Sequence, residues 1–282
     1  MTSEYDTLLT AIDARLSETL PSQIPQLLDA LPLGVWGKLL LDVPPRYANL
    51  KAFSPSMPSD IIQTNWTGNH GTSLLSQTVA FVESLVRGYR ELTGRSLETA
   101  RVLDFGCGWG RIIRLLYKYV GYENIFAVDP WDEAIALCKQ HGVKAHLALS
   151  EEVLTTLPFD REFDLIYAFS VFTHLSEKTA HAALNTLRRY IAGDGVLVIT
   201  IRPKQYWHAH GHTVAEQMMA KHDHSGFAFL PHNRTPIDGD ITFGDTSMSV
   251  EYIKTNFSPW RLLSQTCNTI DPYQVLLFLR PT

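Results

Sequence analysis

The sequence predicts an α/β fold: a mainly parallel sheet of seven strands, covered by helices on both faces and ending in an antiparallel hairpin. From residue 101 onward, short apolar segments of strand length alternate with segments of helical periodicity. This alternation is typical of a parallel sheet whose strands are buried on both faces. The last two predicted strands are joined by only five residues, NTIDP, a link too short for a parallel crossover.

The predicted elements follow one another in a regular order. Strands are predicted over 101–105, 124–129, 143–149, 163–169, 195–201, 260–267 and 273–280. Amphipathic helices are predicted over 111–121, 132–142, 177–192 and 249–257. Residues 203–246 interrupt the alternation and are rich in His, Gly and Pro, which indicates an insertion at the functional edge of the sheet.

The first 95 residues have a different pattern. Apolar residues recur with helical spacing over 8–16 and 74–86, whereas the Pro- and Ser-rich stretch 42–60 cannot form a long helix. We therefore predict a helical N-terminal cap over 1–95 and a second unit over 96–282 that carries the insertion 203–246.

The composition excludes several functional classes. The 282-residue chain has 24 basic and 29 acidic side chains, and its net charge, 24 − 29 = −5, gives no basic field for non-specific nucleic-acid binding. The three cysteines, Cys107, Cys138 and Cys267, form no CxxC pair, so we expect free thiols in a reducing compartment. No segment resembles a signal peptide or a membrane span. We expect a cytoplasmic protein without a membrane or nucleic-acid partner.

The most informative segment is the glycine-rich turn VLDFGCGWGR at 102–111. Gly106, Gly108 and Gly110 lie between a predicted strand and a predicted helix, and without Cβ they let the backbone turn sharply against a ligand. Asp104, at the end of the strand, is placed to accept a hydrogen bond or to balance a cation. Asp129 ends the next strand, where a carboxylate can accept both hydroxyls of a ribose.

This pattern resembles the motif D-x-G-x-G-x-G with a strand-end acid of class I S-adenosylmethionine (SAM)-dependent methyltransferases, whose fold is Rossmann-like. FDLIYAFSVFTHL at 163–175 and IAGDGVLVIT at 191–200 resemble later motifs of this superfamily, although AGDG at 192–195 replaces the usual Pro-Gly-Gly turn. A NAD(P)-binding domain is the alternative. Its fingerprint G-x-G-x-x-G needs glycine at position 111, where Arg111 stands.

The resemblance implies SAM as the cofactor and assigns its binding residues. Those flanking the methionine moiety would be Asp104, Gly106, Cys107, Gly108 and Gly110. Asp129 would hold the ribose. Pro130 and Trp131 would lie beside the adenine, and Phe169 and Ser170 near the sulfonium. Ser150 or Glu151 would approach the adenine amine, and Glu152 is a further candidate for this position.

A second candidate segment lies in the predicted cap, at TNWTGNHGTSLL, residues 64–75. Trp66 and Gly68 precede a predicted helix whose start Thr72 or Ser73 can cap. One interpretation is a lid segment in which Trp66 and Gly68 touch the methionine end of SAM. The other is a plain junction between a loop and a helix, and both stay open.

Histidines are the candidates for catalysis. The insertion holds six of the chain's eleven: His208, His210, His212, His222, His224 and His232. A metal site, a general base and solvated loop histidines are competing interpretations. No HExxH or Cys/His spacing supports a metal, so none is predicted. His222 and His224 are the candidate bases in the insertion, and His174, in FTHL after the fourth strand, is either a base or a packing residue.

The sequence therefore predicts an enzyme that transfers a methyl group from SAM to an oxygen or nitrogen of a small molecule, such as a metabolite, natural product or sugar. No NPPY-like motif follows the fourth strand, which argues against a nucleic-acid base as the acceptor. A protein or peptide acceptor and a non-catalytic SAM-binding subunit are the alternatives. The oligomeric state is left open.

Overall fold

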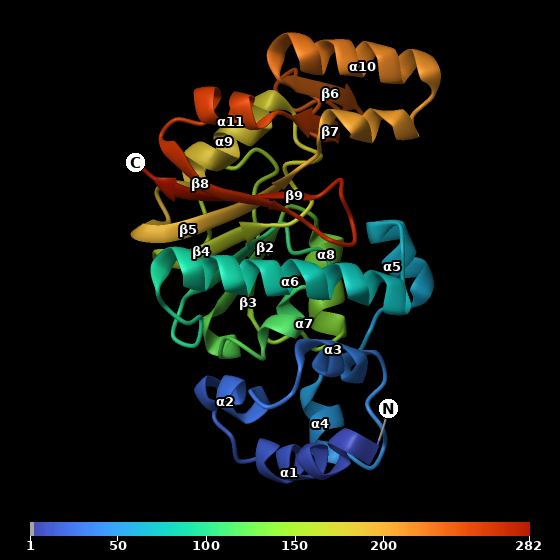
Figure 1. Cartoon of the computed structure of the whole chain (residues 1–282), viewed down its shortest axis with the longest axis vertical. Coiled ribbons are helices and arrows are strands. Elements are labelled where there is room, and N and C mark those ends of the chain that lie inside the picture. Colours follow the sequence, from blue (N-terminus) through green and yellow to red (C-terminus); the bar gives the residue numbers. More distant parts are fainter. Residues whose placement is uncertain (1–2) are drawn as a thin grey trace.

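A seven-stranded sheet crosses the centre of the computed structural model, which describes residues 3–282 (Figure 1). Its strands lie in the order β3-β2-β1-β4-β5-β9-β8. Their bounds are β1 Val102–Phe105, β2 Ile125–Asp129, β3 His146–Leu149, β4 Phe163–Ala168, β5 Ile191–Ile201, β8 Trp260–Cys267 and β9 Val275–Pro281. Strands β1 to β5 pair in parallel, while β9 is antiparallel to both β5 and β8. The predicted fold class is confirmed.

The strands direct alternate side chains into two hydrophobic cores, one on each face of the sheet. Val102 and Leu165 belong to the first core, which is covered by α6 Gly71–Thr93, α7 Ile113–Leu116 and α8 Asp132–Gln140. Leu103 and Ile166 belong to the second, which is covered by α9 Glu177–Leu187 and α11 Val250–Asn256. Figure 1 shows α6 and α9 on opposite sides of the sheet. Because both faces are covered, ligands can reach the sheet only at its edges.

The N-terminal region adds a small helical layer below α6 and α7 (Figure 1). Its elements are short: 3-10 turns Ser3–Tyr5 and Pro21–Gln23, and helices α1 Asp6–Leu16, α2 Ile24–Leu28, α3 Leu33–Leu41, α4 Ala48–Phe53 and α5 Asp60–Thr67. Leu28 and Trp36 of this layer share one hydrophobic core with Val102 of the sheet. Helix α6, which lies inside the predicted cap, covers the sheet itself.

Two helix boundaries differ from the prediction. Only Ile113–Leu116 of the segment 111–121 is α-helical, and a turn precedes it in which the Trp109 and Gly110 carbonyls accept hydrogen bonds from the Arg114 side chain. The helix predicted over 177–192 ends at Leu187, because Tyr190 and Ile191 join the edge of β4 at Phe163. Strand β5 therefore begins at Ile191 rather than at residue 195, with an irregular register at its start.

The start of α6 is a further correction. The helix begins at Gly71 with His70 as its N-cap residue, and no side chain caps it. Thr72 and Ser73 lie inside the first turn, so the prediction that one of them caps the helix is wrong. Gly68 instead ends α5 in the left-handed conformation.

The insertion forms a compact unit at the carboxyl edge of the sheet (Figure 1). It contains a 3-10 helix Lys204–Ala209, helix α10 His212–Ser225 and the antiparallel hairpin β6 Phe227–Pro231 with β7 Gly244–Met248. The predicted boundary at 246 therefore lies inside β7. Backbone N–H groups of Gly244 and Met248 donate to the carbonyls of His174 and Arg202, which fixes β7 beside the ends of β4 and β5.

None of the helices formed by residues 3–282 combines the length and the hydropathy that a bilayer crossing requires.

Two lysines, the buried Lys118 and the half-buried Lys144, join the N-terminal layer to the rest of the fold. Lys118 lies in the turn that follows α7. Its ammonium group donates to the carbonyls of Leu28 and Asp29, 2.9 and 2.8 Å away. Lys144 likewise donates to the carbonyl of Phe53, the last residue of α4. Carbonyls at a helix C-terminus lack intrahelical partners and carry partial negative charge, so a cation there is favourable.

We expect Lys118→Met to lower the free energy of unfolding by about 1–3 kcal/mol, because two carbonyls at the end of α2 lose their donor in a buried position. Urea unfolding followed by far-UV circular dichroism measures the change. Lys51→Met, on the exposed face of α4, is the matched control and should change stability little. Equal losses in the two variants would argue against this anchoring role.

Candidate functional site

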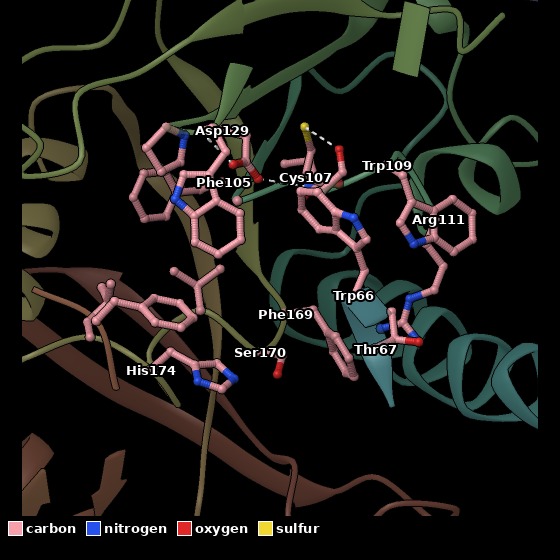
Figure 2. A pocket seen from close by; sticks show the side chains of 18 of the residues that line it. Trp66, Thr67, Phe105, Cys107, Trp109, Arg111, Asp129, Phe169, Ser170 and His174 are labelled. Carbon is pink, nitrogen blue, oxygen red and sulfur yellow. Dashed lines mark hydrogen bonds between the residues drawn. The ribbon is translucent and has the colours of Figure 1, made fainter. Parts of the chain in front are cut away.

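A cavity of about 1170 Å³ opens at the carboxyl edge of the sheet. It is lined by the glycine-rich loop after β1, by the ends of β2, β4 and β5, by α5 and by the loop between β8 and β9. Figure 2 shows side chains from α5, the glycine-rich loop and the ends of β2 and β4 around this space. The position agrees with open α/β sheets generally, in which ligands bind outside the carboxyl ends of the strands where the strand order reverses. Here β1 lies between β2 and β4, so the reversal falls at β1.

Two glycines of the loop are required for different reasons. Gly106 has φ +80°, and a Cβ there would lie 2.4 Å from Val171 Cγ2, so the loop and the end of β4 could not approach as they do. Gly110 has φ +77° and packs against Val143 and Cys138 rather than lining the cavity. Its absence of Cβ lets the loop pack against the end of α8.

Asp129 fixes the glycine loop. Its Oδ2 accepts from the Gly108 N–H at 2.9 Å and its Oδ1 accepts from the Trp131 N–H at 3.0 Å. Burial raises the pKa of this carboxyl group, and the two backbone hydrogen bonds oppose the rise. Each carboxylate oxygen can accept more than one hydrogen bond, so Asp129 can hold the loop and bind a ligand hydroxyl together.

Asp104 is buried at the end of β1 and its Oδ2 has no hydrogen-bond partner within residues 3–282. Burial raises its pKa to about 8; the neighbouring Tyr167 hydroxyl opposes the rise, the charge of Asp129 adds to it, and the charge of Arg111 opposes it. An unpartnered buried carboxyl group is costly. A cationic ligand in the cavity would relieve this cost by favouring the ionised form.

Aromatic side chains form one wall of the cavity. The Trp131 ring lies 5.5 Å from Trp66 of α5 and 5.4 Å from Phe243, between centroids. The Arg234 guanidinium lies over both Trp131 and Phe243, at 4.7 and 4.4 Å. Trp66 also lies beside the glycine loop, 3.7 Å from the place a Gly108 Cβ would take. The N-terminal layer and the insertion thus meet across the cavity through Trp131.

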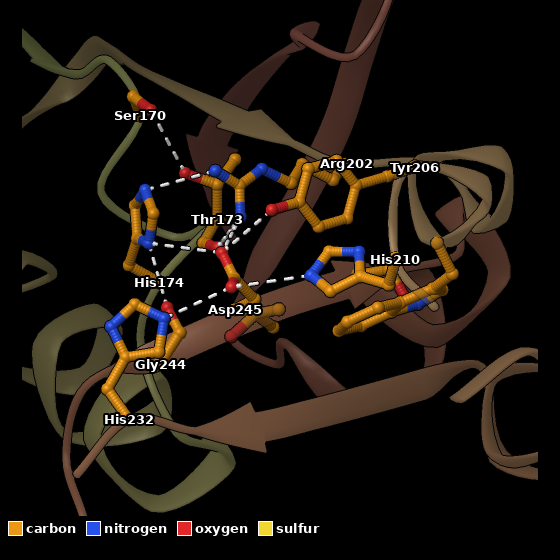
Figure 3. A network of polar contacts seen from close by, with 12 residues as sticks. Ser170, Thr173, His174, Arg202, Tyr206, His210, His232, Gly244 and Asp245 are labelled. Atoms are coloured by element: carbon orange, nitrogen blue, oxygen red, sulfur yellow. Dashed lines mark hydrogen bonds and ion pairs between the residues drawn. The ribbon is translucent and has the colours of Figure 1, made fainter. Parts of the chain in front are cut away.

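A polar network centred on Asp245 lies beyond the end of β5 (Figure 3). Its Oδ1 accepts from Arg202 at 2.7 Å and from Tyr206 at 2.8 Å, and its Oδ2 contacts His232 Nε2 at 3.1 Å. Burial opposes ionisation of Asp245, but the hydrogen bonds from His232 and Tyr206 and the Arg202 charge outweigh it and lower the pKa. Asp245 is therefore the counter-ion of Arg202 at neutral pH.

His174 is held in one neutral tautomer by this network. Its Nδ1 lies 2.8 Å from the Gly244 carbonyl, which can only accept, so Nδ1 carries the proton. Its Nε2 lies 3.1 Å from an Arg202 nitrogen, which can only donate, so Nε2 is the acceptor. Burial, aided by the Arg202 charge, lowers the pKa of His174 to about 4. Both ring nitrogens are engaged within the protein.

The structure brings most of the predicted site residues together. Those lining the cavity are Trp66, Gly68, Asp104, Gly106, Cys107, Gly108, Asp129, Pro130, Trp131, Ser150, Glu151, Phe169, Ser170 and His174. Gly110 supports the loop from outside. His222 and His224 lie on α10 away from the cavity: His222 contacts Ser247 at 2.8 Å and His224 is exposed. Within residues 3–282, no group of three His, Cys, Asp or Glu side chains has a geometry that could hold a metal ion.

Sequence reasoning missed two groups of cavity residues. Arg202 and Tyr206 follow β5 and line the cavity. Arg202 comes directly after a predicted strand, and this position at the carboxyl end of a strand could have marked it as a candidate site residue. The second group is a chain of hydrogen bonds from Arg111 through Gln77 to Asp271, which joins three distant segments. No sequence pattern connects residues so far apart in the chain.

The fold and the site define an α/β protein whose glycine-rich loop and strand-end acids surround a ligand cavity. In a comparison with known proteins, residues 102–195 match the family model described as a methyltransferase domain. This match covers a third of the chain and agrees with the resemblance found in the sequence.

Individual relatives resemble only parts of the chain or its fold. A ubiquinone biosynthesis O-methyltransferase of Bradyrhizobium diazoefficiens is 36% identical over 77 residues, 27% of this chain and 30% of the relative. Curated relatives such as this are matched over about a third of their length.

Two solved structures are similar in fold. A SAM-dependent methyltransferase from Clostridium acetobutylicum has a TM-score of 0.51 at 13% identity, covering 78% of this chain and 96% of that one. DesVI of Streptomyces venezuelae has a TM-score of 0.52 at 12% identity, covering 80% and 100%.

The buried His174 predicts a pH dependence of stability. Its folded pKa, about 4, lies below its ordinary value of 6.5. The unfolded chain therefore gains a proton as the pH falls through about 6.5, while the folded protein does not until about 4. The stabilisation by the neutral ring is complete above this window and is lost as the pH falls through it.

We expect His174→Asn, whose side chain does not titrate, to lose less unfolding free energy than the wild type between about pH 7.5 and pH 5. Urea unfolding at the two pH values measures this difference. His224→Asn, at an exposed site on α10, is the control and should follow the wild-type pH dependence. A wild-type pH dependence in His174→Asn would show that this ring is not the source.

Proposed function

We propose that this protein transfers a methyl group from SAM to an oxygen or nitrogen of a small-molecule acceptor. The observation that carries the proposal is the cavity at the end of β1, where a glycine-rich loop, the ribose-type acid Asp129 and the unpartnered Asp104 face one space. The methyltransferase domain match over residues 102–195 supports the same conclusion.

The residues present fit the cofactor. Asp104 Oδ2 lacks a partner, as expected of a carboxylate that would bind the ammonium group of the methionine moiety. The backbone at Gly106 and Gly108 would cradle that moiety, Asp129 would accept from the ribose hydroxyls, and Trp131 would pack against the adenine. When bound, SAM supplies a methyl group on a positively charged sulfur, which is electrophilic without a metal or a redox step.

The cavity has room for an acceptor beside the cofactor. Pockets for single drug-sized ligands measure about 300–1,000 Å³, and this one is larger. The part beyond Ser170 is lined by Tyr206, Tyr273 and Gln274 together with Arg202. The Tyr206 and Tyr273 rings lie 5.9 Å apart, edge to face, and hydroxyl and amide groups surround them. Such a lining suits a small polar molecule with an apolar ring face.

Positioning of the acceptor is the proposed source of catalysis. His174 lines the cavity, but the Arg202 guanidinium already donates to its Nε2, so it holds Arg202 in place instead of acting as a base. His222 and His224 lie outside the cavity and are not included in the proposal. Holding a nucleophile in line with the methyl group can contribute up to about 7–11 kcal/mol to lowering the barrier.

Calorimetric titration of the purified, ligand-free chain with S-adenosylhomocysteine tests the proposed cofactor, with NADH as the comparison ligand. We expect micromolar binding of S-adenosylhomocysteine and no binding of NADH. Transfer of labelled methyl groups from SAM to candidate acceptors then tests the reaction. Binding of NADH alone would overturn the proposal in favour of a dehydrogenase, and binding without transfer to any acceptor would favour a non-catalytic subunit.

Asp129→Ala should weaken S-adenosylhomocysteine binding at least about tenfold, because a ribose contact and the anchor of the Gly108 N–H are lost together. Calorimetry measures the affinity, and the unfolding midpoint checks that the variant is folded. Asp160→Ala removes an exposed acid outside the cavity and is the matched control. Unchanged affinity in Asp129→Ala would remove the ribose assignment.

A further inference from the structure

Arg111 is a cationic residue that lines the cavity and has no role in the function proposed above. It follows the glycine-rich loop, lines the cavity and lies with its guanidinium 5.0 Å above the centre of the Phe169 ring (Figure 2). Among residues 3–282, no carboxylate lies within 4.0 Å of its nitrogens. Arg202, in the same wall, is by contrast paired with Asp245 at 2.7 Å.

The Arg111 guanidinium is held in place by a chain of hydrogen bonds. One terminal nitrogen donates to Gln77 Oε1 at 2.7 Å, and Gln77 Nε2 donates to Asp271 Oδ2 at 2.7 Å. Asp271 is itself fixed, because its Oδ1 accepts from the Tyr273 N–H at 3.0 Å. Gln77 belongs to α6 and Asp271 to the loop between β8 and β9. Burial lowers the pKa of Arg111 to about 10, and the charges of Asp104 and Asp271 oppose this effect. The uncharged amide of Gln77 orients the guanidinium and stands between it and Asp271.

Asp104 precedes the glycine-rich loop in the sequence and Arg111 follows it, and both line the cavity. Each affects the pKa of the other, yet they do not form an ion pair within 4.0 Å. A guanidinium presents a planar fork of N–H donors that matches a carboxylate, and Asp104 offers an unpartnered oxygen for an ammonium group. A guanidinium and a carboxyl group that a cationic ligand would ionise line one space without pairing with each other, which fits a zwitterion, the ionic form of an α-amino acid.

We propose that Arg111 binds the carboxylate of the cofactor's amino-acid moiety, and that Gln77 and Asp271 act as positioning residues for its guanidinium. This inference rests on the proposed cofactor. It assigns a carboxylate site to a residue that stands where the dinucleotide fingerprint would have glycine. It also gives the N-terminal region, through Gln77 and its hydrogen bond to Arg111, an indirect part in cofactor binding.

The test compares two ligands that differ only in the amino-acid part. S-adenosylhomocysteine carries the ammonium and carboxylate groups, and 5′-methylthioadenosine keeps the nucleoside and thioether without them. In calorimetry on the full chain, we expect Arg111→Met to weaken S-adenosylhomocysteine binding about 10- to 100-fold and to leave 5′-methylthioadenosine binding unchanged. Gln77→Ala should weaken only S-adenosylhomocysteine, by about 3- to 10-fold. Arg87→Met, on the exposed face of α6, is the matched charge control.

The outcomes separate this inference from the proposed function. Equal weakening of both ligands by Arg111→Met, or no weakening of either, would overturn the carboxylate assignment. The second result would leave Arg111 available for a carboxylate on the acceptor instead. If the wild type binds neither ligand, the proposed cofactor fails, and with it the inference. A fourth outcome is that Arg111→Met weakens S-adenosylhomocysteine binding relative to 5′-methylthioadenosine binding, whereas Gln77→Ala leaves both affinities unchanged. This outcome would support the carboxylate contact of Arg111 and overturn the positioning role of Gln77.

Discussion

One buried cation, Arg114, connects the glycine-rich loop to the N-terminal layer. Its guanidinium donates to the Trp109 and Gly110 carbonyls inside the loop and to the Ser56 carbonyl outside it, and it lies 5.0 Å from the centre of the Trp109 ring. Its own carbonyl accepts from the Trp36 indole at 3.0 Å. Burial lowers its pKa to about 10, so it stays charged at neutral pH. A buried arginine without a carboxylate partner is tolerable because backbone carbonyls satisfy its donors.

The electrostatics of the cavity follow from this rigid loop. The Gly108 N–H of the loop donates to Asp129, and Asp104 before the loop and Arg111 after it do not pair with each other. Burial raises the pKa of Asp104 to about 8, and a cationic ligand would favour its ionised form and so bind more strongly. The acceptor side is arranged differently, because Arg202 and Asp245 neutralise each other there. The cavity therefore has one end with the ionisable groups of Asp104 and Arg111 free to bind a ligand, and another end where Arg202 and Asp245 form an ion pair.

The fold could be predicted from the sequence because its signals are local. Apolar strands alternating with amphipathic helices, and the short NTIDP link, define a mainly parallel sheet with an antiparallel hairpin. The cofactor side could be predicted for the same reason, since the glycines and strand-end acids stand in fixed order along the chain. Predictions failed where long-range contacts override local pattern. Helix α7 is cut short beside the Arg114 contacts, and α9 ends early because Ile191 pairs with Phe163.

The acceptor side could not be predicted because its residues meet only in three dimensions. His222 and His224 were chosen for their chemistry, but α10 turns them away from the cavity, where His222 contacts Ser247. The residues that do line this side, such as Tyr206 and Gln274, come from separate segments and form no motif. A prediction from the sequence could say that an acceptor site exists near the insertion, but it could not name its members.

The hydrogen bond between Gln77 and Asp271 can form only after nearly the whole chain has been synthesised. The two residues are 194 positions apart, and Arg280 likewise donates to the Leu92 carbonyl across 188 positions. Synthesis proceeds from the N-terminus, so α6 emerges long before the hairpin of β8 and β9 that completes its surroundings. Contacts of such high sequence separation form slowly. The cavity is thus among the last parts of the molecule to be completed, and a nascent chain without its terminal hairpin lacks the lining residues Asp271, Tyr273 and Gln274.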